Sequence, residues 1–166
     1  MRKPYNYDRL TTLSIEEGLR LIRNAHESIE RSVREELTLE EAPSWMVRMI
    51  RNRAEKNFCC ATIQGFKCSV YSLRLLTFLT YGIKCSVSTC HLQGAFFAVE
   101  RTKTKKPSNI VRYHLNLWAV NEAGYEVLMT HDHTVSRGTG GADSIQNTTT
   151  MCDNHNSIKS KTENIK

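Results

Sequence analysis

Cysteines and histidines are the residues of this chain best suited to chemistry, and it holds six of each. Cys85-x4-Cys90-His91 and His131-x-His133 offer the thiolate and imidazole ligands that zinc prefers. Neither group contains the C-x-x-C pair of a tight ligand turn, and the two histidines fit the alternation of an ordinary strand. The sequence therefore predicts no metal site and no cofactor.

Other catalytic arrangements have no clear signature either. A cysteine nucleophile would need a histidine beside it, and no local motif marks such a pair among the candidate histidines, which are His91, His114, His131 and His133. The carboxylates of residues 16–41 alternate with arginines as on a solvated helix. Gly138-Thr-Gly-Gly precedes no helical pattern, so it does not indicate a phosphate-binding loop. We therefore expect a protein that binds and assembles, with no catalytic residues and no small-molecule substrate.

Positive charge is concentrated in the middle of the chain. The formal net charge is +6, and residues 42–135 hold 12 basic and 5 acidic side chains, for a net charge of +7. Such a field attracts RNA, an anionic membrane or an acidic protein surface. The loop of residues 102–109 has few aromatic side chains, which argues against base stacking. The predicted contact residues are Arg48, Arg51, Arg53, Lys56, Arg101, Lys103, Lys105, Lys106 and Arg112.

Two helices are predicted before the basic loop. Ser14 and Glu17 form the S-x-x-E capping box at the start of a helix of about 23 residues, whose single apolar stripe suits packing on the body or on a second copy of the chain. The second helix, over 43–56, is amphipathic and basic, a type that lies on membranes or acidic partners and also occurs in protein cores. Its bulky apolar residues include Trp45 and Met49.

The rest of the body reads mainly as strands. We expect strands over 58–63, 83–101, 110–120 and 125–135, a hairpin turn at 121–124, and a short buried helix or strand over 70–81. The fold class is thus α+β, with N-terminal amphipathic helices packed on a mainly antiparallel sheet. One domain is expected over 1–137, with a helical part (14–56) and a β-rich part (57–137). Residues 138–166 have almost no aliphatic side chains and are predicted to form a disordered polar tail.

The chain gives no signal for membrane insertion or export. No apolar run is long enough to span a bilayer, the first residues lack the apolar core of a signal peptide, and no glycine follows Met1 for myristoylation. We therefore expect reduced thiols in the cytosol or nucleus.

The order of a cysteine-rich strand (Asn57-Phe-Cys-Cys), a helix, and strands containing Cys90-His-Leu-Gln-Gly94 resembles the matrix proteins of rhabdoviruses, particularly those of plant-infecting cytorhabdoviruses. The resemblance covers residues 57–135. It implies a viral structural protein that self-associates, bridges nucleocapsid and the inner face of the envelope, and occurs in the virion and host cytoplasm, peripheral at membranes. Pro4-Tyr5 does not match the Pro-Pro-x-Tyr budding motif of animal relatives.

Other classes of protein fit the same pattern of elements. A viral RNA-binding accessory protein or silencing suppressor would use the same basic field. A hotdog or nuclear-transport-factor-like domain would instead surround a pocket for a small molecule, and an intracellular adaptor is a further alternative. A deep apolar pocket with convergent polar groups would favour the pocket-bearing classes, whereas a flat basic face would favour assembly.

Overall fold

The computed structural model describes residues 7–37, 42–102 and 113–163. Within these ranges the chain forms four α-helices and a seven-stranded, mostly antiparallel sheet, so the predicted α+β class is confirmed. The elements are β1 (Tyr7–Leu13), α1 (Ile15–Glu36), α2 (Ser44–Phe58), β2 (Cys60–Ile63), β3 (Phe66–Ser69), α3 (Leu73–Tyr81), β4 (Gly94–Thr102), β5 (Tyr113–Val120), β6 (Glu126–His133), β7 (Thr148–Cys152) and α4 (Asp153–Glu163), with two short 3₁₀ turns at Arg137–Thr139 and Ile145–Asn147.

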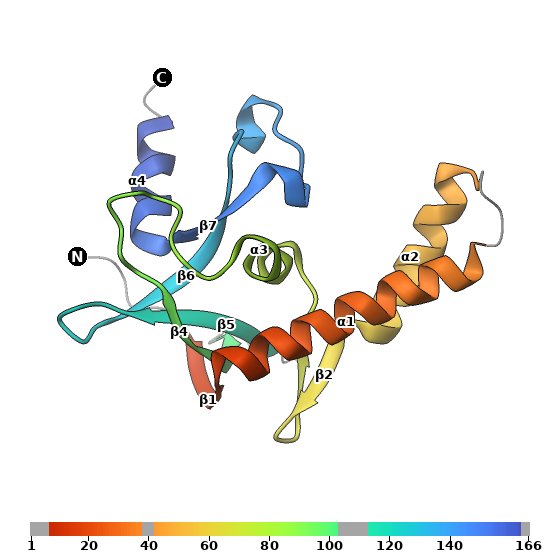
Figure 1. Ribbon diagram of the computed structural model, residues 1–166, viewed down its shortest axis with the longest axis horizontal. Coiled ribbons are helices and arrows are strands. Elements are labelled where there is room, and N and C mark those ends of the chain that lie inside the picture. The colour runs from red at the N-terminus through yellow and green to blue at the C-terminus, as the bar shows by residue number, and fades with distance from the viewer. Residues whose placement is uncertain (1–6, 38–41, 103–112, 164–166) are drawn as a thin grey trace.

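The sheet is built around β4 and β5. Its order is β1-β4-β5-β3-β2, and β6 pairs with the other part of β5 and carries β7 at its outer side. All pairs are antiparallel except β3 with β5. Figure 1 shows α1 crossing the sheet, α3 between α1 and the β6–β7 ribbon, and α4 beside that ribbon. Side chains from α3, α4 and the β6–β7 ribbon can therefore meet near the loop between β6 and β7.

Helix α1 begins where the capping box predicts. The Ser14 hydroxyl accepts a hydrogen bond from the backbone N–H of Glu17 at 3.1 Å. One turn later Gly18 packs against Phe97 of β4 so closely that an added Cβ would lie 2.1 Å from the ring. The first half of α1 thus seals the main core, whereas Ile29 and Val33 in its second half pack on Ile50 and Ala54 of α2. The apolar stripe of α1 therefore packs within the same chain. The hairpin formed by α1 and α2 projects beyond the sheet (Figure 1).

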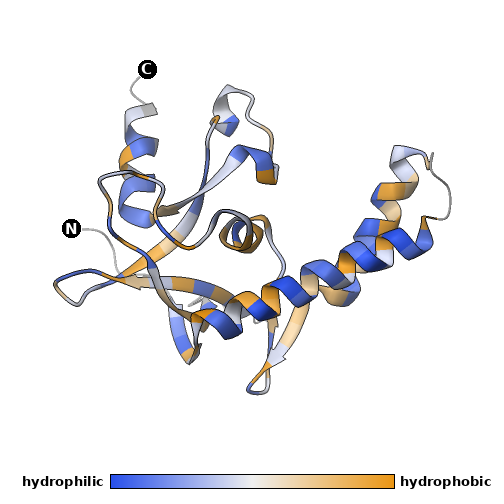
Figure 2. Cartoon of the chain, in the orientation of Figure 1, coloured by the Kyte–Doolittle hydropathy of each residue, from blue (hydrophilic) through white to orange (hydrophobic). Residues whose placement is uncertain are grey.

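The main core lies between the sheet and helices α1 and α3. Figure 2 shows apolar residues on the inner sides of these elements, while α4 is hydrophilic along most of its length. The largest fully buried side chains are Phe78, Phe97, Ile22, Ile29, Leu75, Leu115, Leu117 and Met129. Burying each of these contributes about 1.5–3 kcal/mol relative to exposure. No helix in the described ranges is both long and apolar enough to cross a membrane.

Most of the predicted elements are confirmed, with three local differences: the strand expected over 83–101 is shorter, and strands β1 and β3 were not predicted. The 70–81 segment is a helix, and Gly82 ends it with a φ of 83°. Of the predicted strand 83–101, only Gly94–Thr102 is a strand, because the segment before it is a loop fixed by an isolated bridge between Lys84 and Gln93. Strand β1 was not predicted. It is an edge strand with a mixed burial pattern, so it lacks the clean alternation of a half-buried strand.

The prediction that residues 138–166 form a disordered tail is wrong for the described part of this segment. Strand β7 pairs with β6, and Met151 and Cys152 are in the main core. Two of its three threonines are buried with partners for their hydroxyls: Thr148 Oγ1 lies 2.9 Å from Thr77 Oγ1 of α3, and Thr150 Oγ1 donates to the Gly82 carbonyl at 2.6 Å. Satisfied hydroxyls remove the cost of burying these polar side chains, so the segment is ordered although it has few aliphatic residues.

Candidate metal centre and histidine cleft

Four side chains from the two ends of the β4–β7 region meet in one cluster. Cys85 and Cys90 lie in the loop before β4, Cys152 ends β7, and His155 lies in the first turn of α4. Their ligand atoms are all within 4.8 Å of one another, and the three cysteines are buried. His155 Nδ1 lies 3.1 Å from Cys152 Sγ and 3.7 Å from Cys85 Sγ. Tetrahedral zinc with bonds of about 2.0–2.3 Å separates its ligand atoms by roughly 3.3–3.8 Å.

The donor set of this cluster fits a structural zinc ion. Three thiols and one imidazole complete a tetrahedron and leave no position for a substrate, as in closed structural sites. Burial, together with the neighbouring Cys85 and Cys90, raises the pKa of the Cys152 thiol to about 12. Three buried thiolates would need a cation to be stable, and Zn²⁺ supplies that charge. The backbone N–H of Cys152 donates to Cys85 Sγ at 3.4 Å and orients it.

This ligand set differs from the one considered in the sequence. Cys85 and Cys90 take part, but His91 is exposed and is not in the cluster, and neither is His131 or His133. The other two members of the cluster, Cys152 and His155, were not considered in the sequence. Their C-x-x-H spacing is a short ligand spacing of the kind that a tight turn provides. That signal was present in the sequence, but it lay in the segment predicted to be disordered.

A second group of polar side chains gathers around His131 and His133 at the end of β6. The two rings are 5.4 Å apart between centroids. His133 Nε2 lies 2.8 Å from the Asp143 carboxylate, in the loop between β6 and β7. If this nitrogen carries the proton, Nδ1 of the neutral ring holds the free lone pair. A histidine oriented by a carboxylate is the arrangement of a general base.

The β6–β7 loop that holds Asp143 is fixed by Asn147. The Asn147 amide accepts from the Val135 N–H at 2.8 Å and donates to the carbonyls of Val135 and Ala142 at 3.0 and 2.9 Å. Gly141 passes so close to this point that an added Cβ would lie 1.9 Å from the Val135 carbonyl oxygen. These contacts close a rigid loop without aliphatic packing, so they set the positions of the residues between 135 and 147.

Helix α4 brings two further groups to the same strand end. The Asn156 amide donates to the His131 carbonyl at 3.4 Å and to Thr130 Oγ1 at 3.0 Å. Lys159, one turn later, donates to the His133 carbonyl at 2.6 Å and pairs with the Asp132 carboxylate. Because His155 of the cysteine cluster precedes Asn156, the candidate metal centre and this polar group share one helix. The geometry of α4 therefore depends on the cluster of cysteines.

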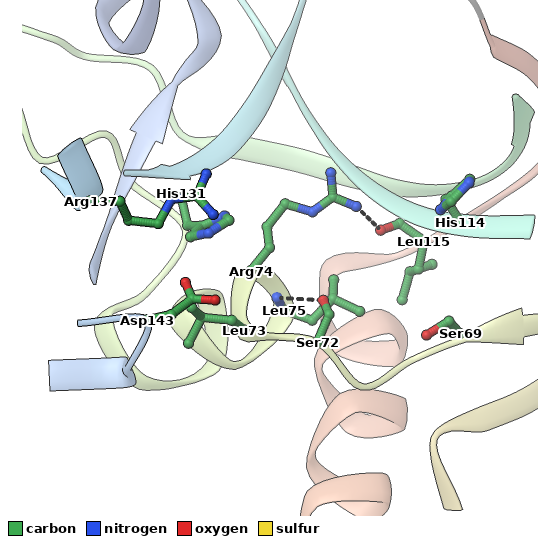
Figure 3. Close-up of a pocket in the computed structure, with 10 residues that line it drawn as sticks. All are labelled: Ser69, Ser72, Leu73, Arg74, Leu75, His114, Leu115, His131, Arg137 and Asp143. Atoms are coloured by element: carbon green, nitrogen blue, oxygen red, sulfur yellow. Dashed lines mark hydrogen bonds between the residues drawn. The ribbon is translucent and has the colours of Figure 1, made fainter. Parts of the chain in front are cut away.

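His131 borders an open cleft of about 420 Å³, and Asp143, which holds His133, lines the same cleft. Figure 3 shows Arg74, His131 and Arg137 extending toward it from α3, β6 and the β6–β7 loop. Burial lowers the pKa of His131 below its ordinary value, and the charges of His133, Arg74 and Arg137 lower it further. The cleft is thus a cationic environment, and it is lined by Ser69, Ser72, Leu73, Arg74, Leu75, His114, Leu115, His131, Arg137 and Asp143.

The structure describes five of the predicted basic contact residues, four on α2 and one on β4. Arg51 and Arg53 of α2 form ion pairs with Glu30 and Glu36 of α1, and Arg101 pairs with Asp8 of β1. Arg48 and Lys56 are exposed on α2. The other predicted cations lie outside the described residues, and they are Lys103, Lys105, Lys106 and Arg112.

The remaining cysteines have no catalytic setting. Burial raises the pKa of the Cys68 thiol to about 12, which keeps it protonated and unreactive. Cys59 and Cys60 are half-buried neighbours, with their sulfur atoms 3.5 Å apart, and burial also raises the pKa of Cys59. Comparison with known proteins identifies no relative, since no family model, curated protein or solved structure matches the chain.

Proposed function

We propose that this protein is a zinc-stabilised hydrolase of phosphodiester bonds in nucleic acid, acting with a divalent cation. The observation that carries the proposal is the convergence at the end of β6 of a carboxylate-oriented histidine, oxygen ligands and arginines. His133 is held by Asp143. Asp132 and Asn156 supply the oxygen atoms that Mg²⁺ prefers, and Arg74 and Arg137 border the adjoining cleft.

Each group has a defined role in the proposed reaction. His133 removes a proton from a water molecule, whose oxygen forms a bond to phosphorus as the bond from phosphorus to the leaving sugar oxygen breaks. That oxygen leaves with a proton from solvent water. Asp132 and Asn156 would hold a divalent cation, which would supply positive charge to the phosphate oxygens. Lys159, which now pairs with Asp132, provides the positive charge at this carboxylate before the cation binds.

The charge distribution supports nucleic acid as the substrate. The chain carries a formal net charge of +6. Cations that neutralise phosphates supply most of the sequence-independent affinity of a protein for nucleic acid. The zinc cluster supports the same proposal, because it fixes β7 and α4, and these elements carry or brace the residues of the reaction.

Nucleic-acid cleavage with and without added cation tests this proposal. Purified protein is mixed with plasmid DNA, single-stranded DNA or RNA, in buffer with Mg²⁺ or Mn²⁺ or with neither. We expect cleavage of at least one substrate only when the cation is added. In the control reaction the Mg²⁺ or Mn²⁺ is left out of the buffer rather than chelated, because a chelator would also remove zinc. Absence of cleavage by zinc-loaded protein with either cation on all three substrates would overturn the proposed activity.

A second candidate function is matrix-type assembly at an anionic membrane. It is favoured by the outer face of α2, where Trp45 and Met49 are 63% and 52% exposed beside Arg48 and Lys56. Exposed bulky apolar side chains next to cations suit a membrane surface with anionic lipid. In this role the chain would self-associate and contact nucleocapsid or RNA, as the resemblance to rhabdovirus matrix proteins implies.

Liposome sedimentation separates this candidate from the first. We expect binding to vesicles with anionic lipid at low salt, weakened as salt rises, because exposed charges are screened beyond about 8–10 Å near physiological ionic strength. Changing Trp45→Ala and Met49→Ala together should reduce binding, whereas Ile158→Ala, an equally exposed apolar residue on α4, serves as the control. Equal binding by these variants would exclude the α2 face as the membrane contact.

A further inference from the structure

The cleft beside His131 has more positive charge than the protein itself neutralises. Two arginines, Arg74 and Arg137, line it together with Asp143 as its single carboxylate among the described lining residues. Asp143 is hydrogen-bonded to His133 and thus already has a partner. Four hydrogen-bonding side chains from separate elements complete the lining, and they are Ser69, Ser72, His114 and His131.

Arg74 is fixed in this cleft by uncharged acceptors. Its Nη2 donates to Asn116 Oδ1 at 2.8 Å and to the Leu115 carbonyl at 3.3 Å. The nearest carboxylate in this network, Glu100, is reached only through Asn116, whose amide donates to it at 2.7 Å, and Glu100 itself pairs with Arg9. Burial lowers the pKa of Arg74, so desolvation of the guanidinium is not offset by a direct ion pair. A guanidinium has five donors, and the contacts of Nη2 leave others to meet a ligand.

Arg137 faces Arg74 across the cleft from a rigid loop. Its turn is closed by backbone hydrogen bonds from Thr139 to Ser136 and from Gly140 to Arg137, and the loop is braced by Asn147. Ser72 caps α3, so the positive end of that helix opens on the same space between the two arginines (Figure 3). The cationic groups are therefore positioned in advance by elements that do not depend on a ligand.

We propose that this cleft is a binding site for a phosphate group, held between the guanidinium groups of Arg74 and Arg137 with the Ser69 and Ser72 hydroxyls as additional donors. Planar guanidinium groups match phosphate oxygens and pair with them more strongly than neutral donors do. The phosphate comes from a polynucleotide backbone or from a free phosphate compound. The first source rests on the proposed function and would place the phosphate next to the bond cleaved at His133. Phosphate binding at this site does not require that the protein cleave nucleic acid.

Calorimetric titration tests the site without cleavage. Zinc-loaded protein carrying His133→Ala is titrated with inorganic phosphate and, separately, with a short single-stranded oligonucleotide, in the absence of Mg²⁺. We expect both to bind and to compete. Adding Arg137→Gln should weaken the binding of phosphate about tenfold, the equivalent of one charge-assisted hydrogen bond. Arg31→Gln, which removes an equally exposed arginine from α1, should leave the affinity for phosphate unchanged and is the matched control.

The outcomes separate the site from the proposed function. Phosphate binding that Arg137→Gln weakens and Arg31→Gln does not supports the site, whether or not the protein cleaves nucleic acid. If the oligonucleotide does not compete, the phosphate comes from a free compound and the polynucleotide source is excluded. No binding of phosphate, or equal affinity in the two arginine variants, overturns the proposal. Arg137 is exposed on a surface turn, so the test does not depend on a variant that fails to fold.

Discussion

Replacing Cys152 with serine is expected to remove zinc from the protein and to lower its thermal midpoint sharply. Cys152 is fully buried, its sulfur lies against His155, and it ends the strand that closes the sheet. Structural zinc contributes roughly 10–16 kcal/mol of apparent binding free energy in small domains. Even if about 5 kcal/mol of this stabilises the native state, the midpoint should fall by roughly 10–20 °C in a chain of this size.

Elemental analysis and thermal unfolding measure the two effects. Wild-type protein purified without chelator should contain about one zinc per chain, and Cys152→Ser should contain far less. The control is Cys60→Ser, which alters a half-buried thiol outside the cluster and should keep both the zinc and the midpoint. Wild-type protein that carries no zinc, even after refolding with the metal, would show that the four residues form only a buried polar cluster.

Replacing His133 with alanine should reduce cleavage of nucleic acid by about 10²- to 10⁴-fold, the range attributed to a general base. The expected loss is in the rate at saturating substrate, because His133 acts on water and the cleft arginines remain. The side chain is mostly buried, with 11% of its surface exposed, so folding of the variant is checked by thermal unfolding and zinc content.

Two further measurements separate a chemical from a structural role of His133. Added imidazole should restore part of the activity of His133→Ala, since it can occupy the space left and accept the proton, whereas a structural defect would not respond. His91→Ala, which removes an exposed histidine outside the cleft, should cleave at the wild-type rate. Activity of His133→Ala within a few-fold of wild type would falsify the assignment of His133 as the base.

The helical hairpin and the central strands could be predicted from the sequence because their local signals agree with their tertiary environment. The Ser14 capping box and the apolar stripe of α1 reappear in the structure, and Leu115, Leu117 and Ala119 of β5 lie together in the main core. Strand β1 and the C-terminal elements escaped prediction for a different reason. Their order depends on long-range partners, such as Thr77 for Thr148 and Gly82 for Thr150, which no local pattern reveals.

The candidate site was only partly visible in the sequence. The cysteines Cys85 and Cys90 were recognised, but Cys152 and His155 follow three intervening strands, β4, β5 and β6, and the pairing of β7 with β6 brings them back to the loop before β4. In the same way, His131 and His133 were read as ordinary alternating residues of a strand. Their chemical setting is created by Asp143, Arg74 and α4, which come from distant parts of the chain.

Helix α1 joins two parts of the protein that have separate hydrophobic cores. Its second half and α2 form a small core of their own, with Ile29, Val33, Ile50 and Ala54, joined to the sheet through the first half of α1 and Tyr71. Substitutions far apart and without shared partners usually affect stability independently. The outer face of α2 can therefore diverge in sequence, and so change what it contacts, while the cleft at the other side of the molecule keeps its geometry. A change in what the outer face of α2 binds therefore need not alter the chemistry at the cleft.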